Sequence, residues 1–125
     1  MSIIPDDFLT LAQELNNNSC EVRNRTAASR AYYCAYHACI NLFQINIPRE
    51  HQKGGMHNNF IQSLERSTNK NDRRIGIILR DIYNRRLLAD YDLQTAFPES
   101  SSTQAIKQTQ RLLEQLKTIS DQLAN

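Results

Sequence analysis

The stretch from Ile75 to Ile82 carries isoleucine and leucine every three or four residues, which is the spacing of one face of an α-helix. At about 100° per residue, the next position on this face is Arg86. A guanidinium group keeps its charge, so it needs an anionic or hydrogen-bonding partner there. Asp90 follows one turn later. The pair is either an internal ion pair that fixes helix packing or part of a ligand-binding site.

The chain has 125 residues, which is enough for one domain with a hydrophobic core and too few for two, so we expect residues 1–125 to form a single domain. Glycine and proline number three each, and good helix-forming residues dominate, which predicts an all-α protein. The formal net charge of +2 does not by itself indicate nucleic acid. Arginines nevertheless gather in two predicted helices, where they suit phosphate binding or form solvated helix faces.

Five helices are predicted, at about residues 5–15, 19–45, 56–67, 71–90 and 103–123. Asn71 or Asp72 is expected to cap the fourth helix, and the serine-rich end of the last loop is expected to cap the fifth. Together these segments predict an all-α helical bundle of four to five helices.

The long second helix has a distinct pattern of apolar and small residues. A packing seam is predicted from residues that alternate in spacing between four and three: Val22, Thr26, Ser29, Tyr33, Tyr36, Ile40 and Phe43. Alanines beside the seam would let neighbouring helices come close: Ala27, Ala28, Ala31, Ala35 and Ala38. Cys34 and Cys39 are interpreted as small packing residues, because three cysteines without a CxxC pair indicate neither a disulfide framework nor a zinc site.

Polar groups interrupt or flank these apolar faces in three places. The candidate catalytic residues are Arg86, Asp90 and Tyr91. The candidate RNA- or phosphate-binding residues are Arg30, His37, His57 and Arg85. Cationic and imidazole groups that converge in a crevice could bind a phosphodiester, or assist metal-free RNA cleavage by acid–base catalysis. The histidines and the tyrosines of the second helix also fit purely structural roles.

Other kinds of chemistry lack a motif in this sequence. There is no glycine-rich phosphate loop, no HExxH and no Gly-x-Ser-x-Gly. Histidines and carboxylates do not occur at metal-ligand spacing, so neither a metal nor a cofactor is expected. The sequence has no signal peptide pattern and no apolar stretch of about 20 residues, so we expect a cytoplasmic protein without a membrane segment.

Three motifs in order resemble the small HEPN domains (higher eukaryotes and prokaryotes nucleotide-binding). The run RTAASRAYYCAYHA, residues 25–38, resembles the signature of their second helix. Gly55-Met56-His57 resembles the start of their next helix, and RLLADY at residues 86–91 resembles their Arg-x-x-Ala-Asp-Tyr motif. The resemblance covers about residues 20–95 and implies an all-α up-and-down bundle that forms a homodimer with a cleft at the dimer interface. It also implies a role in a toxin–antitoxin, nucleotidyltransferase-linked or antiviral defence system.

Many proteins of this family are metal-independent endoribonucleases with an arginine, four to six intervening residues and then a histidine. This chain has Asp90 and Tyr91 in that region and no histidine. An ionised aspartate is a poor proton donor to a leaving oxygen. Enzyme activity is therefore left open: the chain is a candidate metal-independent endoribonuclease without the usual catalytic histidine.

Two functions remain from the sequence. One is a HEPN-like protein that binds or cleaves RNA through an Arg86-centred cleft. The other is a non-catalytic dimeric helical adaptor that partners a nucleotidyltransferase or an antitoxin. In either case we expect a two-fold homodimer in which the second and fourth helices line a shared basic groove, with Tyr32, Arg30 and the alanines as the contact surface.

Overall fold

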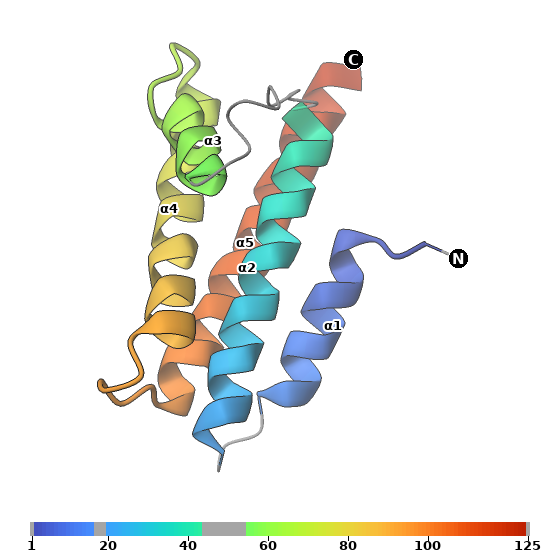
Figure 1. Ribbon diagram of the computed structural model, residues 1–125. Helices are drawn as coiled ribbons and strands as arrows, with labels where there is room; N and C mark the ends of the chain where they lie inside the picture. Colours follow the sequence, from blue (N-terminus) through green and yellow to red (C-terminus); the bar gives the residue numbers. More distant parts are fainter. Residues whose placement is uncertain (1, 17–19, 44–54, 125) are drawn as a thin grey trace.

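The computed structural model describes residues 2–16, 20–43 and 55–124. These residues form five α-helices and no strand (Figure 1). The helices are α1 (Pro5–Leu15), α2 (Glu21–Phe43), α3 (Met56–Glu65), α4 (Lys70–Tyr91) and α5 (Glu99–Ala124). The prediction of an all-α helical bundle is confirmed. Within the described ranges, no helix combines the length and the apolar character that a membrane crossing requires.

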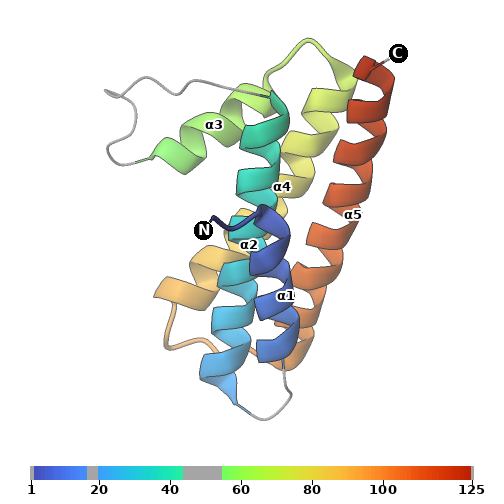
Figure 2. The same ribbon diagram turned by 90° about the vertical axis from the view of Figure 1, so that its right-hand side faces the viewer.

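Four of the helices run alternately down and up along the bundle. Figures 1 and 2 show α1 and α4 running in one direction and α2 and α5 in the other. The middle position belongs to α2, which packs against α1, α4 and α5. The short α3 packs against α4. This arrangement places one flank of α2 next to α4, the helix that carries Arg86.

Small side chains explain how α2 can be enclosed by three helices. Four of its alanines are fully buried: Ala27, Ala28, Ala31 and Ala35. Because an alanine side chain ends at Cβ, neighbouring helices can approach closely at these positions. Cys34 and Cys39 are fully buried too, and burial raises the pKa of both thiols. Their predicted role as small packing residues is confirmed.

The predicted packing seam of α2 is only partly correct. Ser29 and Tyr36 are buried, but Val22 and Thr26, near the start of the helix, are exposed. The reason is that α2 is buried around most of its circumference, so a single stripe does not describe its packing.

The surface predicted for dimer contacts is also wrong in its main part. Tyr32 and the four buried alanines pack inside the chain, where a second copy cannot reach them. Of the residues predicted for this surface, Arg30 is partly exposed. The small residues that were expected to contact a partner pack against other helices of the same chain instead.

Two helix starts differ from the prediction. The α4 cap is Asn69, whose side-chain oxygen accepts hydrogen bonds from the backbone nitrogens of Asn71 and Asp72, at 2.8 and 3.1 Å. The last helix already begins at Glu99, so the serine-rich stretch lies inside its first turns. Ser102 there is fully buried and donates a hydrogen bond to the backbone oxygen of Glu99.

Gly76 marks a close approach between α3 and α4. A methyl group at this position would lie 2.8 Å from the backbone nitrogen of Glu65 and 3.0 Å from the Cβ atom of Leu64. In an ordinary helix interior, alanine is more stable than glycine by about 1 kcal/mol. Here the added carbon would push the two helices apart, so we expect Gly76→Ala to lower the free energy of unfolding by about 1–3 kcal/mol. Urea denaturation checks this, and a more stable variant would contradict the close packing.

Candidate functional site

Arg86 lies one turn after Ile82 on the buried face of α4, as the apolar repeat predicts. Its side chain is only 12% exposed. The guanidinium Nε donates to Asp90 Oδ2 at 2.8 Å, and Nη2 donates to the hydroxyl of Tyr33 at 3.1 Å. The ion pair that the sequence left as one of two explanations is therefore formed.

Three aromatic rings surround the same guanidinium. Its Cζ atom lies 5.4 Å from the ring centres of Tyr33 and Tyr91 and 5.9 Å from that of Tyr32. These distances are within the range of cation–π attraction. Burial lowers the pKa of Arg86, but Tyr33 and Asp90 outweigh it and the net shift is upward. The charge is therefore permanent and its position is fixed from several sides.

A chain of polar contacts extends from Arg86 across to α2. The Oγ of Ser29 donates to Asp90 Oδ2 at 3.1 Å, and Arg30 Nη2 donates to the same Oγ at 3.3 Å. The guanidinium of Arg30 also lies over the ring of Tyr33, 4.7 Å from its centre. We call Arg86, Asp90, Ser29, Arg30 and Tyr33 the Arg86 cluster. Its two guanidinium groups face the same ring, and the single carboxylate of Asp90 can offset only one of the two positive charges.

His57, at the start of α3, joins this cluster through Tyr32. Its Nδ1 lies 2.7 Å from the hydroxyl of Tyr32, and its ring centre lies 4.2 Å from that of Tyr36. Burial raises the pKa of Tyr32, and burial followed by the charge of Arg86 lowers the pKa of His57. Both groups are then neutral near pH 7. We assign the hydrogen bond as Tyr32 donating to Nδ1, which leaves the imidazole proton on Nε2.

The other two residues predicted to bind RNA or phosphate, His37 and Arg85, lie in different places. His37 is exposed and stacks on Phe8 of α1 at 5.7 Å between ring centres. Since Arg30 also lies over Phe8, at 5.7 Å, His37 is on the rim of the Arg86 cluster. Arg85 is not part of it, because its Nε donates to Gln108 of α5 at 3.1 Å. One position along a helix turns a side chain by about 100°, which directs Arg85 to a different neighbour.

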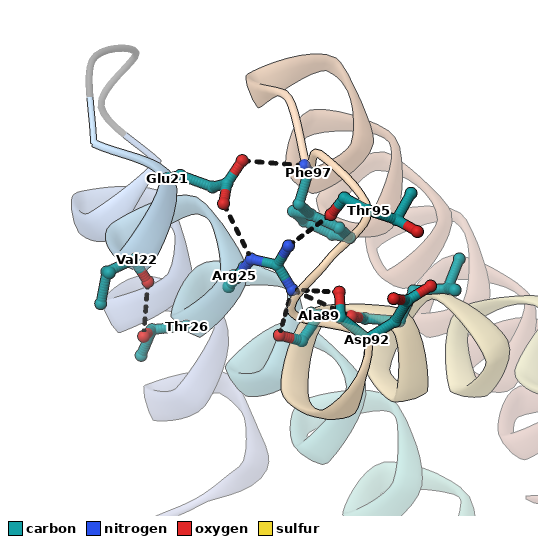
Figure 3. Close-up of polar contacts among 9 residues, drawn as sticks. Glu21, Val22, Arg25, Thr26, Ala89, Asp92, Thr95 and Phe97 are labelled. Atoms are coloured by element: carbon teal, nitrogen blue, oxygen red, sulfur yellow. Dashed lines mark hydrogen bonds and ion pairs between the residues drawn. The ribbon is translucent and has the colours of Figure 1, made fainter.

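Sequence reasoning did not foresee the role of Arg25, which is 7% exposed. Figure 3 shows its guanidinium among carbonyl oxygens of the last turn of α4 and of the loop after it. Nη1 donates to the oxygens of Leu88, Ala89 and Asp92 at 3.0–3.1 Å, and Nη2 donates to that of Thr95 at 2.6 Å. Arg25 therefore binds the last turn of α4 and the loop after it, rather than a ligand.

Glu21 completes this arrangement. Its carboxylate accepts from Arg25 Nε at 3.3 Å and from the backbone nitrogen of Phe97 at 3.0 Å (Figure 3). The hydrogen bond from Phe97 and the nearby Arg25 lower the pKa of Glu21. Together, the two side chains hold the segment that immediately follows Asp90 and Tyr91. Arg25 thus positions the C-terminal part of α4, where the candidate site lies.

The described residues contain no group of three or more histidine, cysteine, aspartate or glutamate side chains that could hold a metal ion. Comparisons of the chain with family models, with curated proteins and with solved structures found no match. The function therefore has to be inferred from the Arg86 cluster and its surroundings.

The lowered pKa of His57 predicts how stability depends on pH. In the unfolded chain this imidazole titrates near 6.5, and in the folded chain it titrates lower because of burial and Arg86. On acidification the unfolded state takes up the proton first, so the free energy of unfolding should fall below about pH 6.5 and level off below the folded pKa. We expect His57→Asn, which keeps an acceptor near Nδ1, to flatten this dependence. Urea denaturation between about pH 5 and pH 7.5 measures it, and parallel profiles would contradict the assignment.

Proposed function

We propose that this chain is a HEPN-like protein of a toxin–antitoxin or antiviral defence module, and that it binds RNA through the Arg86 cluster. The observation that carries the proposal is a fixed, permanently charged guanidinium at the junction of α2 and α4, with a second guanidinium facing the same tyrosine ring. Among the described residues, no acceptor is bound to Nη1 of Arg86. That nitrogen is available for a phosphate oxygen.

The electrostatics of the cluster suit a phosphodiester. Arginine binds phosphate through several N–H donors in a planar group, and its hydrogen bonds to anions are stronger than neutral ones. Asp90 and Tyr33 hold Arg86 in one orientation, so little side-chain freedom is lost when a ligand binds. Arg30 supplies the second positive charge, and the Nε2–H of His57 is a neutral donor close to the same rings.

Binding is better supported than cleavage. The Asp90 carboxylate accepts hydrogen bonds from Arg86 and Ser29, so it serves as an acceptor in this cluster. A carboxylate engaged in this way is poorly placed to donate a proton to a leaving oxygen. Any RNA cleavage should be weak, should need no metal and should be unaffected by a chelator.

A second candidate function, a dimeric adaptor for a nucleotidyltransferase or an antitoxin, is favoured by exposed apolar side chains near the end of α4. Leu88, Tyr91 and Leu93 are all exposed there. Neighbouring exposed apolar groups are typical of protein interaction surfaces.

If this surface forms a homodimer, light scattering at micromolar concentration should give about twice the monomer mass of 14.5 kDa. A monomer would count against the adaptor.

The proposed function is tested by adding the purified chain to a fluorescein-labelled single-stranded RNA of mixed sequence, with excess chelator and low salt. We expect the anisotropy to rise with a dissociation constant that increases with salt, because phosphate contacts release counterions. Absence of binding at low salt would contradict the proposal and leave the adaptor as the better account.

A further inference from the structure

We propose that the groove beside Tyr91 binds one unpaired nucleobase, with the tyrosine ring as the stacking platform, so that the chain selects single-stranded RNA. This inference rests on the proposed function and names the form of RNA that the same site would take. Three features of the end of α4 carry it: an exposed tyrosine, the arginine that holds it, and a groove with polar groups at its edge.

Tyr91 is unusual among the aromatic residues of the chain. It is 70% exposed, whereas the other phenylalanine and tyrosine side chains in the described ranges are buried or partly buried. The residue ends α4, and one of its neighbours is the guanidinium of Arg86 at 5.4 Å from the ring centre. Because Asp90 fixes that guanidinium, the tyrosine ring has a defined support although it faces solvent.

The groove next to this ring lies along one side of α4. It has a volume of about 580 Å³ and is lined by Asn84, Leu87, Leu88, Tyr91 and Asp92. Volumes of this size are typical of small-ligand sites. Two leucines and a tyrosine offer an apolar surface, and an amide and a carboxylate offer hydrogen bonds to the edge of a ligand.

A nucleobase matches this combination. Its flat face stacks on an aromatic ring, and its edge carries donors and acceptors that an amide can satisfy. Asp92 would repel a phosphate but can accept a hydrogen bond from an exocyclic amine of a base. In this arrangement the base would lie in the groove and its phosphate would reach Arg86, whose guanidinium lies 5.4 Å from the ring centre of Tyr91. In a duplex both faces of each base are already stacked, so the groove would accept only an unpaired base.

The experiment compares a 12-nucleotide fluorescent RNA, alone and annealed to its complement, in chelator at fixed salt. The variants are Tyr91→Ala, Tyr91→Phe and the control Ile77→Ala. Ile77 is also a large, exposed apolar residue of α4, at 66% exposure, but it lies outside the groove. Loss of one base-stacking contact should weaken single-strand affinity by about 5- to 100-fold. We expect this loss of single-strand affinity in Tyr91→Ala and near wild-type single-strand affinity in Tyr91→Phe and Ile77→Ala. The duplex should bind more weakly than the single strand, and none of the three substitutions should change its affinity.

The outcomes separate this inference from the proposed function. Single-strand binding that is unchanged in Tyr91→Ala overturns the base-binding groove, while the proposed function stands if binding still depends on Arg86. Equal affinity of the wild type for the single strand and the duplex would also overturn the base-binding groove. A change in oligomeric state on light scattering, with unchanged RNA affinity per protomer, assigns Tyr91 to a protein interface instead. If the wild type binds no RNA, both proposals are wrong.

Discussion

Replacing Arg25 with alanine should lower the free energy of unfolding by about 3–5 kcal/mol, because it removes a buried guanidinium that donates charge-assisted hydrogen bonds to several backbone carbonyl groups. The variant loses hydrogen bonds to four carbonyl groups and to Glu21. Leu88 keeps its hydrogen bond from the backbone nitrogen of Asp92, whereas the carbonyls of Ala89, Asp92 and Thr95 would lose the partner that Arg25 provides. Urea denaturation monitored by circular dichroism measures the change.

Arg23→Ala is the matched control, because Arg23 is an exposed arginine of the same helix whose one hydrogen bond to the described residues is long, at 3.4 Å. We expect it to change stability by less than about 0.5 kcal/mol. Arg25→Lys keeps the charge but cannot reach all of the same acceptors. Its free energy of unfolding should therefore lie between those of the two alanine variants. If Arg25→Ala were as stable as Arg23→Ala, the positioning role of Arg25 would be wrong.

Arg86→Ala should weaken RNA binding by about 10- to 100-fold, which corresponds to the loss of one charge-assisted hydrogen bond. Its effect on stability should be smaller than that of Arg25→Ala, at about 1–3 kcal/mol. The Asp90 side chain is 27% exposed and keeps its hydrogen bond from Ser29, so water can solvate it in the variant. Anisotropy titration and urea denaturation of the same preparation measure the two effects.

Two controls separate binding from folding. Arg85→Ala removes the adjacent arginine, which contacts Gln108 rather than the Arg86 cluster, and should leave RNA affinity close to that of the wild type. The double variant Arg86→Ala with Asp90→Asn removes the unpaired carboxylate charge and should regain stability without regaining affinity. If the double variant bound RNA like the wild type, Arg86 would be a structural residue only.

Much of the fold could be predicted because it depends on local pattern. The apolar repeat of α4 predicted which face is buried and that Arg86 lies on it, and the structure agrees. Helical spacing also predicted that Asp90 would lie one turn after Arg86, and Arg86 Nε is 2.8 Å from Asp90 Oδ2. Both results follow from helix geometry alone, without knowledge of the neighbouring helices.

The role of Arg25 depends on contacts that lie 63–70 residues away along the chain. Its acceptors are backbone oxygens, which every residue carries, so no side-chain pattern marks them. One local signal existed: Arg25 precedes Ala28, Tyr32 and Ala35 at spacings of three, four and three, on the same buried face. An arginine on such a face needs an internal partner, as Arg86 does.

The predicted dimer surface failed for a related reason. Alanines on a helix allow close packing, but their spacing does not tell whether the neighbour is a helix of the same chain or of a partner. In this chain the neighbouring helices are α1 and α5, which contribute Ala12 and Ala105 to the same buried cluster as the alanines of α2. The tertiary arrangement was needed to decide between the two.

The salt dependence of RNA affinity, compared between the wild type and Arg86→Ala, tests most directly whether Arg86 contacts a phosphate. On single-stranded RNA, each neutralised phosphate contributes about 0.7 to the slope of log affinity against log salt concentration. We expect the slope to be shallower by about this amount in Arg86→Ala and unchanged in Arg85→Ala. Equal slopes for the wild type and Arg86→Ala would contradict a phosphate contact at Arg86.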